Sequence, residues 1–492
     1  MRRRLLFWCC GALLACAAPR TPAPELRASP APASASAATA PSAKPPAVAA
    51  EKPAPPPPLE LAEARHVLNR LTFGPRTADV AKLREMGIDA WLAAELAPER
   101  TPDPELERAL EPYREALSTP AELVENWLGA EAMEGEGGRK LMRDLKPHFK
   151  AHLAKVALAE LTRHVVSERQ LEEVMVDFWA NHFNVFAKKG SVQLLAGDYV
   201  ERALRPHALG RFGELLLATA RHPAMLIYLD NQKNRSRGLN ENYARELLEL
   251  HTVGVDSGYG QSDVIDVARV LTGWTLREPP QGSFGFVFDK KRHDNGEKTV
   301  LGVRFPARGG EAEGVRLLEA LAAHPATARH LGRKLCQRFV ADEPPAGCVD
   351  VAARAYLESG GETRAVIRAI VAHESFLAPA AYGAKLKKPL EFAASALRAV
   401  GAVPDGTTQL GDALAALGEP LLLESVPTGY SDSEADWATS GGMLGRLTFA
   451  SMLAFRKLKG VTFDAERALP GASTAELLEA GNLRFLGGSA SE

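Results

Sequence analysis

Residues 239–254 read LNENYARELLELHTVG and have the pattern of an amphipathic helix. Asn240 is a favourable N-cap, and Gly254 suits the positive-φ position that ends a helix. At about 100° per residue, the apolar positions fall on one side of this helix and the polar positions on the other. The polar arc is either a solvated surface with ion pairs four residues apart or the wall of a polar site. The apolar stripe and its flank hold Tyr243, Leu247, Leu250, Ala244, Leu248 and His251; the polar arc holds Glu241, Asn242, Arg245, Glu246 and Glu249.

Helical spacing of apolar residues also dominates the rest of the chain from Leu59 to Phe455. The period changes to two only between residues 282 and 305, where phenylalanines and valines alternate. A polar segment, residues 290–298, separates the two alternating runs, and its Asn295-Gly296 pair favours a tight turn. The sequence therefore predicts an all-α (mostly helical) fold with one small inserted β-hairpin, which has His293 and Asp294 at its tip.

A second helix is predicted from Gln170 to Phe186, and His182 falls in the middle of its apolar face. A histidine at such a position is either a hydrogen-bonded core residue or a ligand or acid–base group. A separate polar stripe follows the same helix at spacings of four residues; it consists of Glu173, Asp177 and Asn181.

The start of the chain has the features of an export signal. Residues 1–18 combine three arginines with an apolar core that is too short to span a bilayer. Leu13-Leu14-Ala15-Cys16 resembles a bacterial lipobox, so we expect Cys16 to be lipidated; cleavage with release of a soluble periplasmic or secreted protein is the alternative. Ala17, which follows the cysteine, favours delivery of the lipoprotein to the outer membrane. Residues 19–58, rich in Pro, Ala and Ser, form a disordered linker, and residues 59–492 form a single large helical domain.

Composition limits the possible partners. A net charge of −2 with 24% charged residues argues against attraction to nucleic acid. Cys336 and Cys348 are the cysteines of the body, and an exported protein can join them in a disulfide or bury them as free thiols.

Several segments of the chain form a characteristic series: residues 66–75, 178–183, 222–225, 240–251, 271–274 and 293–296, and Lys387-Lys388-Pro389 with Glu391-Phe392. Together they resemble one large bacterial family, the domain of unknown function 1800. Tyr430 stands where this resemblance leads us to expect tryptophan. The resemblance implies a mostly helical exported protein with no established activity. It also implies a cell-surface task shared with a second exported protein that resembles sulfatases or alkaline phosphatases.

Two functions follow from the polar residues of these segments. One is a hydrolase for an envelope glycan or ester, in which imidazoles and carboxylates activate water directly or through a bound divalent metal. Against a shared metal, Glu246 and His251 are about 140° apart on their helix. The other is a protein that binds an exported partner or an envelope polymer without turnover. The proposed catalytic residues are Glu246, His182, His293 and Asp294, and the proposed binding residues are Asn242, Arg245, Glu249 and His251.

Overall fold

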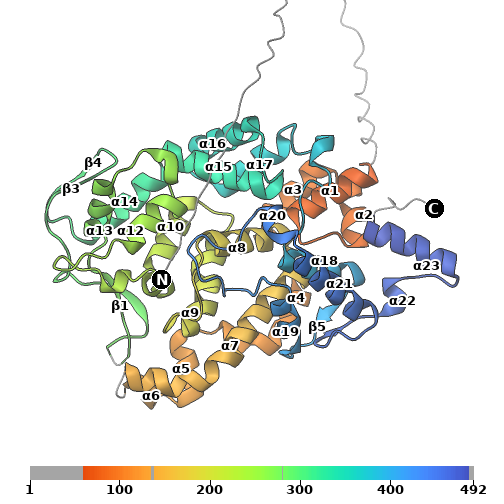
Figure 1. Cartoon of the computed structure of the whole chain (residues 1–492), viewed down its shortest axis with the longest axis horizontal. Coiled ribbons are helices and arrows are strands. Elements are labelled where there is room, and N and C mark those ends of the chain that lie inside the picture. Colours follow the sequence, from red (N-terminus) through yellow and green to blue (C-terminus); the bar gives the residue numbers. More distant parts are fainter. Residues whose placement is uncertain (1–58, 135–137, 280, 487–492) are drawn as a thin grey trace, which may run out of the picture. The chain divides into compact units, whose positions relative to one another are not determined.

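Helices build most of the chain, and the β structure of the described residues is confined to three two-stranded antiparallel sheets (Figure 1). The computed structural model describes residues 59–134, 138–279 and 281–486. The predicted signal, Cys16 and linker lie outside the described residues. The chain from Pro57 onward forms one compact unit with its own hydrophobic core. The predicted fold class is confirmed.

The N-terminal half is a helical array around two buried helices, α7 and α8. Residues 158–166 of α7 are all buried, and α8 contacts α1, α3 and α7. This half contains α1 (Leu61–Leu71), α2 (Thr77–Met86), α3 (Ile88–Glu95), α4 (Pro104–Ala109), α5 (Pro120–Leu128), α6 (Glu131–Glu134), α7 (Arg139–Val166), α8 (Gln170–His182), α9 (Val192–Asp198), α10 (Phe212–Arg221) and α11 (Pro223–Tyr228).

The C-terminal half adds two further groups of helices. In the first group, a disulfide between Cys336 and Cys348 joins α15 to α16, with 6.3 Å between the two Cα atoms, so the disulfide alternative is the one that the structure shows. The first group consists of α13 (Gln261–Val270), α14 (Glu311–Ala322), α15 (Pro325–Phe339), α16 (Ala346–Ser359) and α17 (Thr363–Ala372). The second consists of α18 (Pro389–Val400), α19 (Gln409–Ala416), α20 (Glu434–Trp437), α21 (Ser440–Ala454), α22 (Ala465–Ala468) and α23 (Thr474–Gly481).

The strand pairing differs from the single hairpin that the alternating pattern predicts. The strand β2 (Gly285–Phe288) pairs with β1 (Trp274–Arg277), and β3 (Lys298–Val300) pairs with β4 (Val303–Phe305). The predicted pairing across residues 290–298 is therefore wrong. The tight turn falls at Leu301-Gly302, whose φ angles of 47° and 79° suit a two-residue hairpin. A third sheet joins β5 (Val403–Pro404) to β6 (Val461–Thr462).

The stretch at residues 239–254 is helical, but it changes its winding halfway. The α-helix α12 (Asn242–Glu246) continues as a π-helical turn, η6 (Leu247–His251). The N-cap is Glu241 rather than the predicted Asn240, which lies one residue earlier and accepts the backbone N–H of Asn242 through its side chain at 3.0 Å. Gly254 has the expected positive φ, 84°, and a Cβ there would lie 3.0 Å from a ring nitrogen of His330. Glycine at this position lets the end of the helix approach α15.

Candidate functional site

His182 lies at the C-terminal end of α8 and hydrogen-bonds the end of the central helix. Its Nε2 donates to the carbonyl of His251 at 3.2 Å, and Nε2 of His330 on α15 donates to the carbonyl of Leu250 at 3.1 Å. The last carbonyls of a helix have no partner within it, so the two imidazoles satisfy acceptors that would otherwise be orphaned. This geometry is that of a hydrogen-bonded core histidine.

The three histidines of this cluster are held neutral. Burial lowers the pKa of His251 to about 3, and the positive charge of Lys334 adds to this effect. Burial likewise lowers the pKa of His330 to about 4 and that of His182 well below its usual range. The ring of His251 is 6.0 Å from that of His182, and neither of its nitrogens has a hydrogen-bond partner among the described residues.

Glu246 lies on the opposite, partly exposed side of the central helix. Burial and the neighbouring carboxylate of Glu249 raise its pKa, while Arg245 opposes them. Arg245 contacts Glu241 and Gln261, at 3.4 Å and 3.0 Å. The amide of Asn242 donates to the carbonyl of Leu229 at 3.2 Å and so ties α12 to the end of α11.

His293 and Asp294 belong to a third place, between β2 and β3. Nδ1 of His293 donates to the carbonyl of Thr272 at 2.8 Å. Asp294 accepts Nε of Arg269 at 3.1 Å, and its pKa is lowered by this arginine against the effect of burial. Lys298 forms a buried ion pair with Glu313 beside them at 2.5 Å. These charges are paired with one another.

The eight residues proposed from the sequence therefore occupy three places rather than one. His182 and His251 share a neutral, aromatic interior. Glu246, Glu249, Arg245 and Asn242 share the outer side of the central helix, and His293 with Asp294 stabilises the β segment. The structure keeps His293 and Asp294 together but does not bring His182 or Glu246 to them.

One other histidine–carboxylate group has the spacing of a metal site. Ligand atoms of Glu160, His164 and Glu173 all lie within 4.8 Å of one another, and the three residues are buried. Arg205, however, donates to both oxygens of Glu173 at 2.8 Å and 2.9 Å and to Glu160 at 3.0 Å. Since a guanidinium already neutralises these carboxylates, a divalent cation would meet strong repulsion there. The group is better described as a buried ionic cluster.

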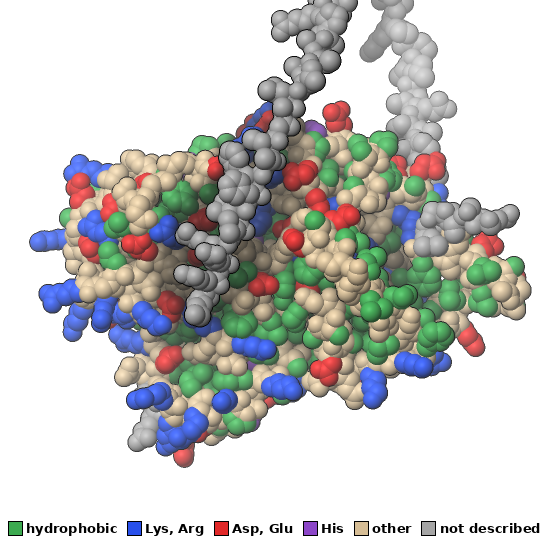
Figure 2. All heavy atoms as spheres, viewed as in Figure 1, with side chains coloured by type: hydrophobic (Ala, Val, Ile, Leu, Met, Phe, Trp, Pro, Cys, Tyr) green, Lys and Arg blue, Asp and Glu red, His purple; other side chains and the backbone are tan. Residues whose placement is uncertain are grey.

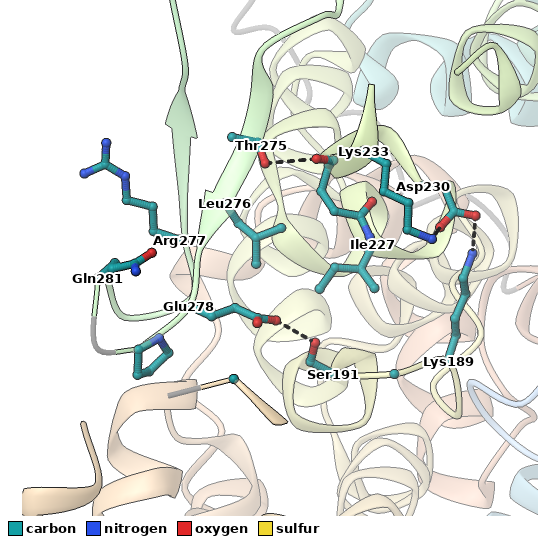
Figure 3. A pocket seen from close by; sticks show the side chains of 14 residues that line it. Lys189, Ser191, Ile227, Asp230, Lys233, Thr275, Leu276, Arg277, Glu278 and Gln281 are labelled. Atoms are coloured by element: carbon teal, nitrogen blue, oxygen red, sulfur yellow. Dashed lines mark hydrogen bonds and ion pairs between the residues drawn. The ribbon is translucent and has the colours of Figure 1, made fainter. Parts of the chain in front are cut away.

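A hollow of about 830 Å³ lies between the start of α9, the end of α11 and β1 (Figure 3). The two lysines and the two carboxylates of its lining all have partners in the cavity wall. Lys189 and Lys233 both reach Asp230, at 2.9 Å and 2.6 Å, and Ser191 donates to Glu278 at 3.0 Å. A ligand with a charged group would have to compete with these internal partners.

A second hollow, about 520 Å³, is dominated by cations; we call it the basic pocket. It lies between α1, α15 and the segment that leads into α18. Five of its side chains are cationic and one is a carboxylate, and the aromatic rings of His66 and Tyr382, stacked with centroids 4.4 Å apart, form part of the wall. The cations are Arg65, Arg70, Arg338, Lys385 and Lys387, and the carboxylate is Glu391.

The charges of the basic pocket are only partly compensated. Arg338 pairs with Glu391 at 2.9 Å, and Lys385 pairs with Asp342, behind the lining, at 2.5 Å. Arg70 donates to the carbonyl of Ala381 at 2.7 Å, a neutral acceptor. The buried Nε atoms of both Arg70 and Arg338 have no partner among the described residues. With two carboxylates for five cations, the pocket keeps an excess of positive charge.

A comparison with known protein families identifies the family of this chain. Residues 66–492 match the model of a family described as a protein of unknown function, DUF1800. The chain belongs to the DUF1800 family. No curated protein and no solved structure matches this chain. Among the residues that the structure describes, no helix is both long enough and apolar enough to cross a membrane.

The sequence contains a pattern that points to the basic pocket, but this pattern consists of basic residues rather than of an acid and a base. Two of the segments that resemble the DUF1800 pattern, residues 66–75 and 387–392, meet at this pocket. The first contributes Arg70 and the second Lys387. Arg70 and Lys387 are therefore basic residues within two DUF1800-like segments that are far apart in the sequence. Arg338 lies outside those segments, so this pattern does not indicate it.

We predict that His251→Phe makes the unfolding free energy less dependent on pH between 3 and 6.5. The native state holds this histidine neutral down to about pH 3, whereas in the unfolded chain it binds a proton below about pH 6.5. The unfolded state therefore binds more protons in this window, and stability falls as the pH falls. Removing the histidine should reduce the slope by up to about 1.4 kcal/mol per pH unit. Urea unfolding at pH 7.5, 6.0 and 5.0 measures how the unfolding free energy changes with pH.

At pH 7.5 the same substitution should leave stability nearly unchanged or higher, since phenylalanine removes two buried nitrogens without partners. His207→Phe, a change at a partly exposed histidine beside α10, is the control and should leave the slope as in the wild type. An unchanged slope for His251→Phe would contradict the neutral state inferred for this cluster.

Proposed function

We propose that this member of the DUF1800 family is an exported cell-envelope protein, anchored through Cys16, that binds an anionic group of an envelope polymer in the basic pocket. The single observation that supports this function is the uncompensated charge of the pocket. Buried guanidinium nitrogens without partners favour an anion that accepts their hydrogen bonds, because charge-assisted bonds are the strong ones.

The chemical class of the ligand follows from the lining. Guanidinium groups recognise phosphate, sulfate and carboxylate through paired donors, and the stacked His66 and Tyr382 offer a flat wall to a sugar ring. We infer a glycan that carries phosphate, sulfate or carboxylate groups. The sulfatase-like or phosphatase-like partner that the resemblance implies acts on esters of the same kind.

Binding without turnover is the better supported of the two functions. A hydrolase of the kind considered for the sequence needs an acid and a base on either side of one bond. The imidazoles of His182 and His251 are neutral and enclosed, and His293 is bound to Thr272 and lies beside Glu313. The basic pocket supplies recognition, and its described lining contains no Ser, Thr or Cys side chain.

Hydrolysis remains the second candidate because of one observation, the raised pKa of Glu246 next to Glu249. A carboxyl group with a raised pKa acts as a general acid or base in many hydrolases. If Glu246 is such a base, Glu246→Gln abolishes hydrolysis of phosphate, sulfate or glycan substrates while the melting temperature stays level. Glu241→Gln on the same arc is the control, and the same assays should find it as active as the wild type. Wild-type protein inert on every substrate would remove this candidate.

For the proposed binding function, we predict that Arg70→Gln weakens the binding of sulfate and phosphate at least tenfold. The substitution removes a buried guanidinium whose Nε lacks a protein partner. Hydrogen bonds to charged groups contribute about 1.5–3 kcal/mol, and about 1.4 kcal/mol corresponds to a factor of ten. Isothermal titration calorimetry with inorganic sulfate, inorganic phosphate and a sulfated sugar measures the loss.

The matched control is Lys233→Gln, which removes one positive charge from the other hollow, where that charge is paired with Asp230. It should leave the affinity unchanged. Arg338→Lys keeps the charge but loses the fork of donors, so it should lie between wild type and Arg70→Gln. Wild-type protein that binds none of the three probes at millimolar concentration, or equal losses in Arg70→Gln and Lys233→Gln, would overturn the proposal.

We also predict that anion affinity falls as the pH rises from 7 to 9. Burial lowers the pKa of Lys387 to about 8, so its ammonium group loses its proton in this range and the pocket loses a positive charge. Sulfate is the suitable probe because its own charge is constant there. Lys387→Arg keeps the charge at all these pH values and should flatten the profile. A wild-type affinity that does not change with pH would show that Lys387 does not contact the anion.

A further inference from the structure

The C-terminal helices expose large apolar side chains, whereas in the rest of the described residues such side chains are mostly buried. Nine of the fourteen exposed large hydrophobic residues lie at or after Val426. Figure 2 shows hydrophobic side chains gathered on the part of this face that holds α19, α21 and α22, with Lys and Arg side chains at its lower margin. The density of these residues, rather than any single one, marks an interaction surface.

The helix α21 carries most of this surface and is apolar on two sides. Its inner side buries Phe449 and Leu453, and the ring of Phe449 meets Phe392 of α18. Its outer side exposes a stripe at helical spacing: Leu444 and Leu447 are 64% and 65% exposed, and Phe455, just after the helix, is 73% exposed. A helix that is apolar all round is normally covered on all sides.

Three cations stand at the C-terminal end of this stripe. Arg456, Lys457 and Lys459 are exposed, and none of them forms an ion pair with another described residue. An apolar stripe that includes an aromatic ring, with free Lys and Arg at its edge, is the composition of an interfacial membrane-binding surface.

The backbone gives a second reason to single out Arg456. The helix ends in a Schellman motif, in which Arg456 N–H bonds the carbonyl of Leu453 at 3.0 Å and Lys457 N–H bonds that of Met452 at 2.7 Å. Arg456 holds the left-handed position, with φ at 56°, where glycine is the usual residue. Holding a long side chain there costs stability, and such a cost at an exposed position favours a role for the charge.

We propose that the outer side of α21, together with Phe455, Arg456, Lys457 and Lys459, docks on the surface of a bilayer that contains anionic lipid. The apolar stripe enters the interface between headgroups and acyl chains, and the three cations lie at the headgroups. A second copy of the chain is the less suitable occupant, because α21 has no carboxylate that could pair with the three cations of another copy. This contact is separate from the basic pocket and from a lipid on Cys16.

Vesicle flotation with the body, Pro57–Glu492, tests the docking without any contribution from a lipid anchor. The body is suitable because it forms one compact unit with its own core. We expect it to float with phosphatidylethanolamine–phosphatidylglycerol vesicles and to remain unbound with phosphatidylcholine vesicles. Binding should weaken as the salt concentration rises, because salt screens exposed charges. Lys457→Gln and Lys459→Gln should each weaken binding about fivefold.

Two variants and one control separate docking from folding. Leu447→Ser with Phe455→Ser should abolish flotation, whereas Val255→Ser, at another apolar residue with 63% of its surface exposed, should change nothing. Arg456→Gly should weaken flotation and yet raise the melting temperature, since glycine suits the left-handed position. A body that floats with neither kind of vesicle would overturn the proposal. So would a dimer in light scattering that Phe455→Ser dissolves, which would assign the face to a second copy. Neither result bears on sulfate binding by the basic pocket.

Discussion

The structure depends on one buried ammonium group, that of Lys388 at the start of α18. It lies 3.4 Å from a carboxylate oxygen of Glu419 and 3.7 Å from one of Asp432. Burial disfavours its charge, but Glu419, Asp432 and two further carboxylates, Asp177 and Glu391, together hold the pKa of Lys388 above its usual range. These carboxylates come from α8, from α18 and from the segment between α19 and α20. Removing the ammonium would leave several carboxylates buried without compensation, which typically costs about 3–5 kcal/mol.

The same charge arrangement explains why the neighbouring pocket stays basic. Lys388 engages Glu419 and Asp432, and Arg338 engages the side chain of Glu391, so these three carboxylates do not pair with the cations beyond them. Arg70 donates to a backbone carbonyl and Lys387 to the hydroxyl of Ser395, which are neutral acceptors. In the larger hollow, by contrast, each lysine has a carboxylate within salt-bridge distance. The two cavities therefore differ in how far their positive charges are compensated by carboxylates.

The helical periodicity was sufficient to predict the fold class, because it depends on neighbours three and four residues apart. It also placed the polar stripe of α8, whose Asn181 holds the loop before α20 by bonding the backbone of Tyr430 in both directions, at 2.9 Å and 2.7 Å. Since backbone atoms of residue 430 make these two bonds, either tyrosine or the tryptophan expected from the resemblance can stand there without loss of them. The strand pairing was not predictable in the same way, because Leu301 adopts a positive φ that its residue type does not suggest.

The candidate site was harder to predict because tertiary structure alone brings its residues together. Arg70 lies 268 residues before Arg338, and Arg338 lies 49 residues before Lys387, so no local spacing relates them. The sequence had instead drawn attention to the histidines, which are polar residues in apolar surroundings. In the structure His182 owes its position to a carbonyl at the end of the central helix, a constraint that arises only after the π-helical turn has formed.

The helix α21 joins the two surfaces for which we propose ligands. From its inner side, Arg446 donates to the carbonyl of Lys387 at 2.9 Å and to that of Trp437 at 3.1 Å, so α21 fixes the backbone of a residue that lines the basic pocket. Its outer side carries the apolar stripe. Arg446 and the apolar stripe lie on opposite sides of α21. A substitution on the outer side therefore leaves the hydrogen bonds of Arg446 in place. A protein attached to a membrane through the outer side of α21 would keep the pocket wall rigid, because the docked helix itself supports that wall.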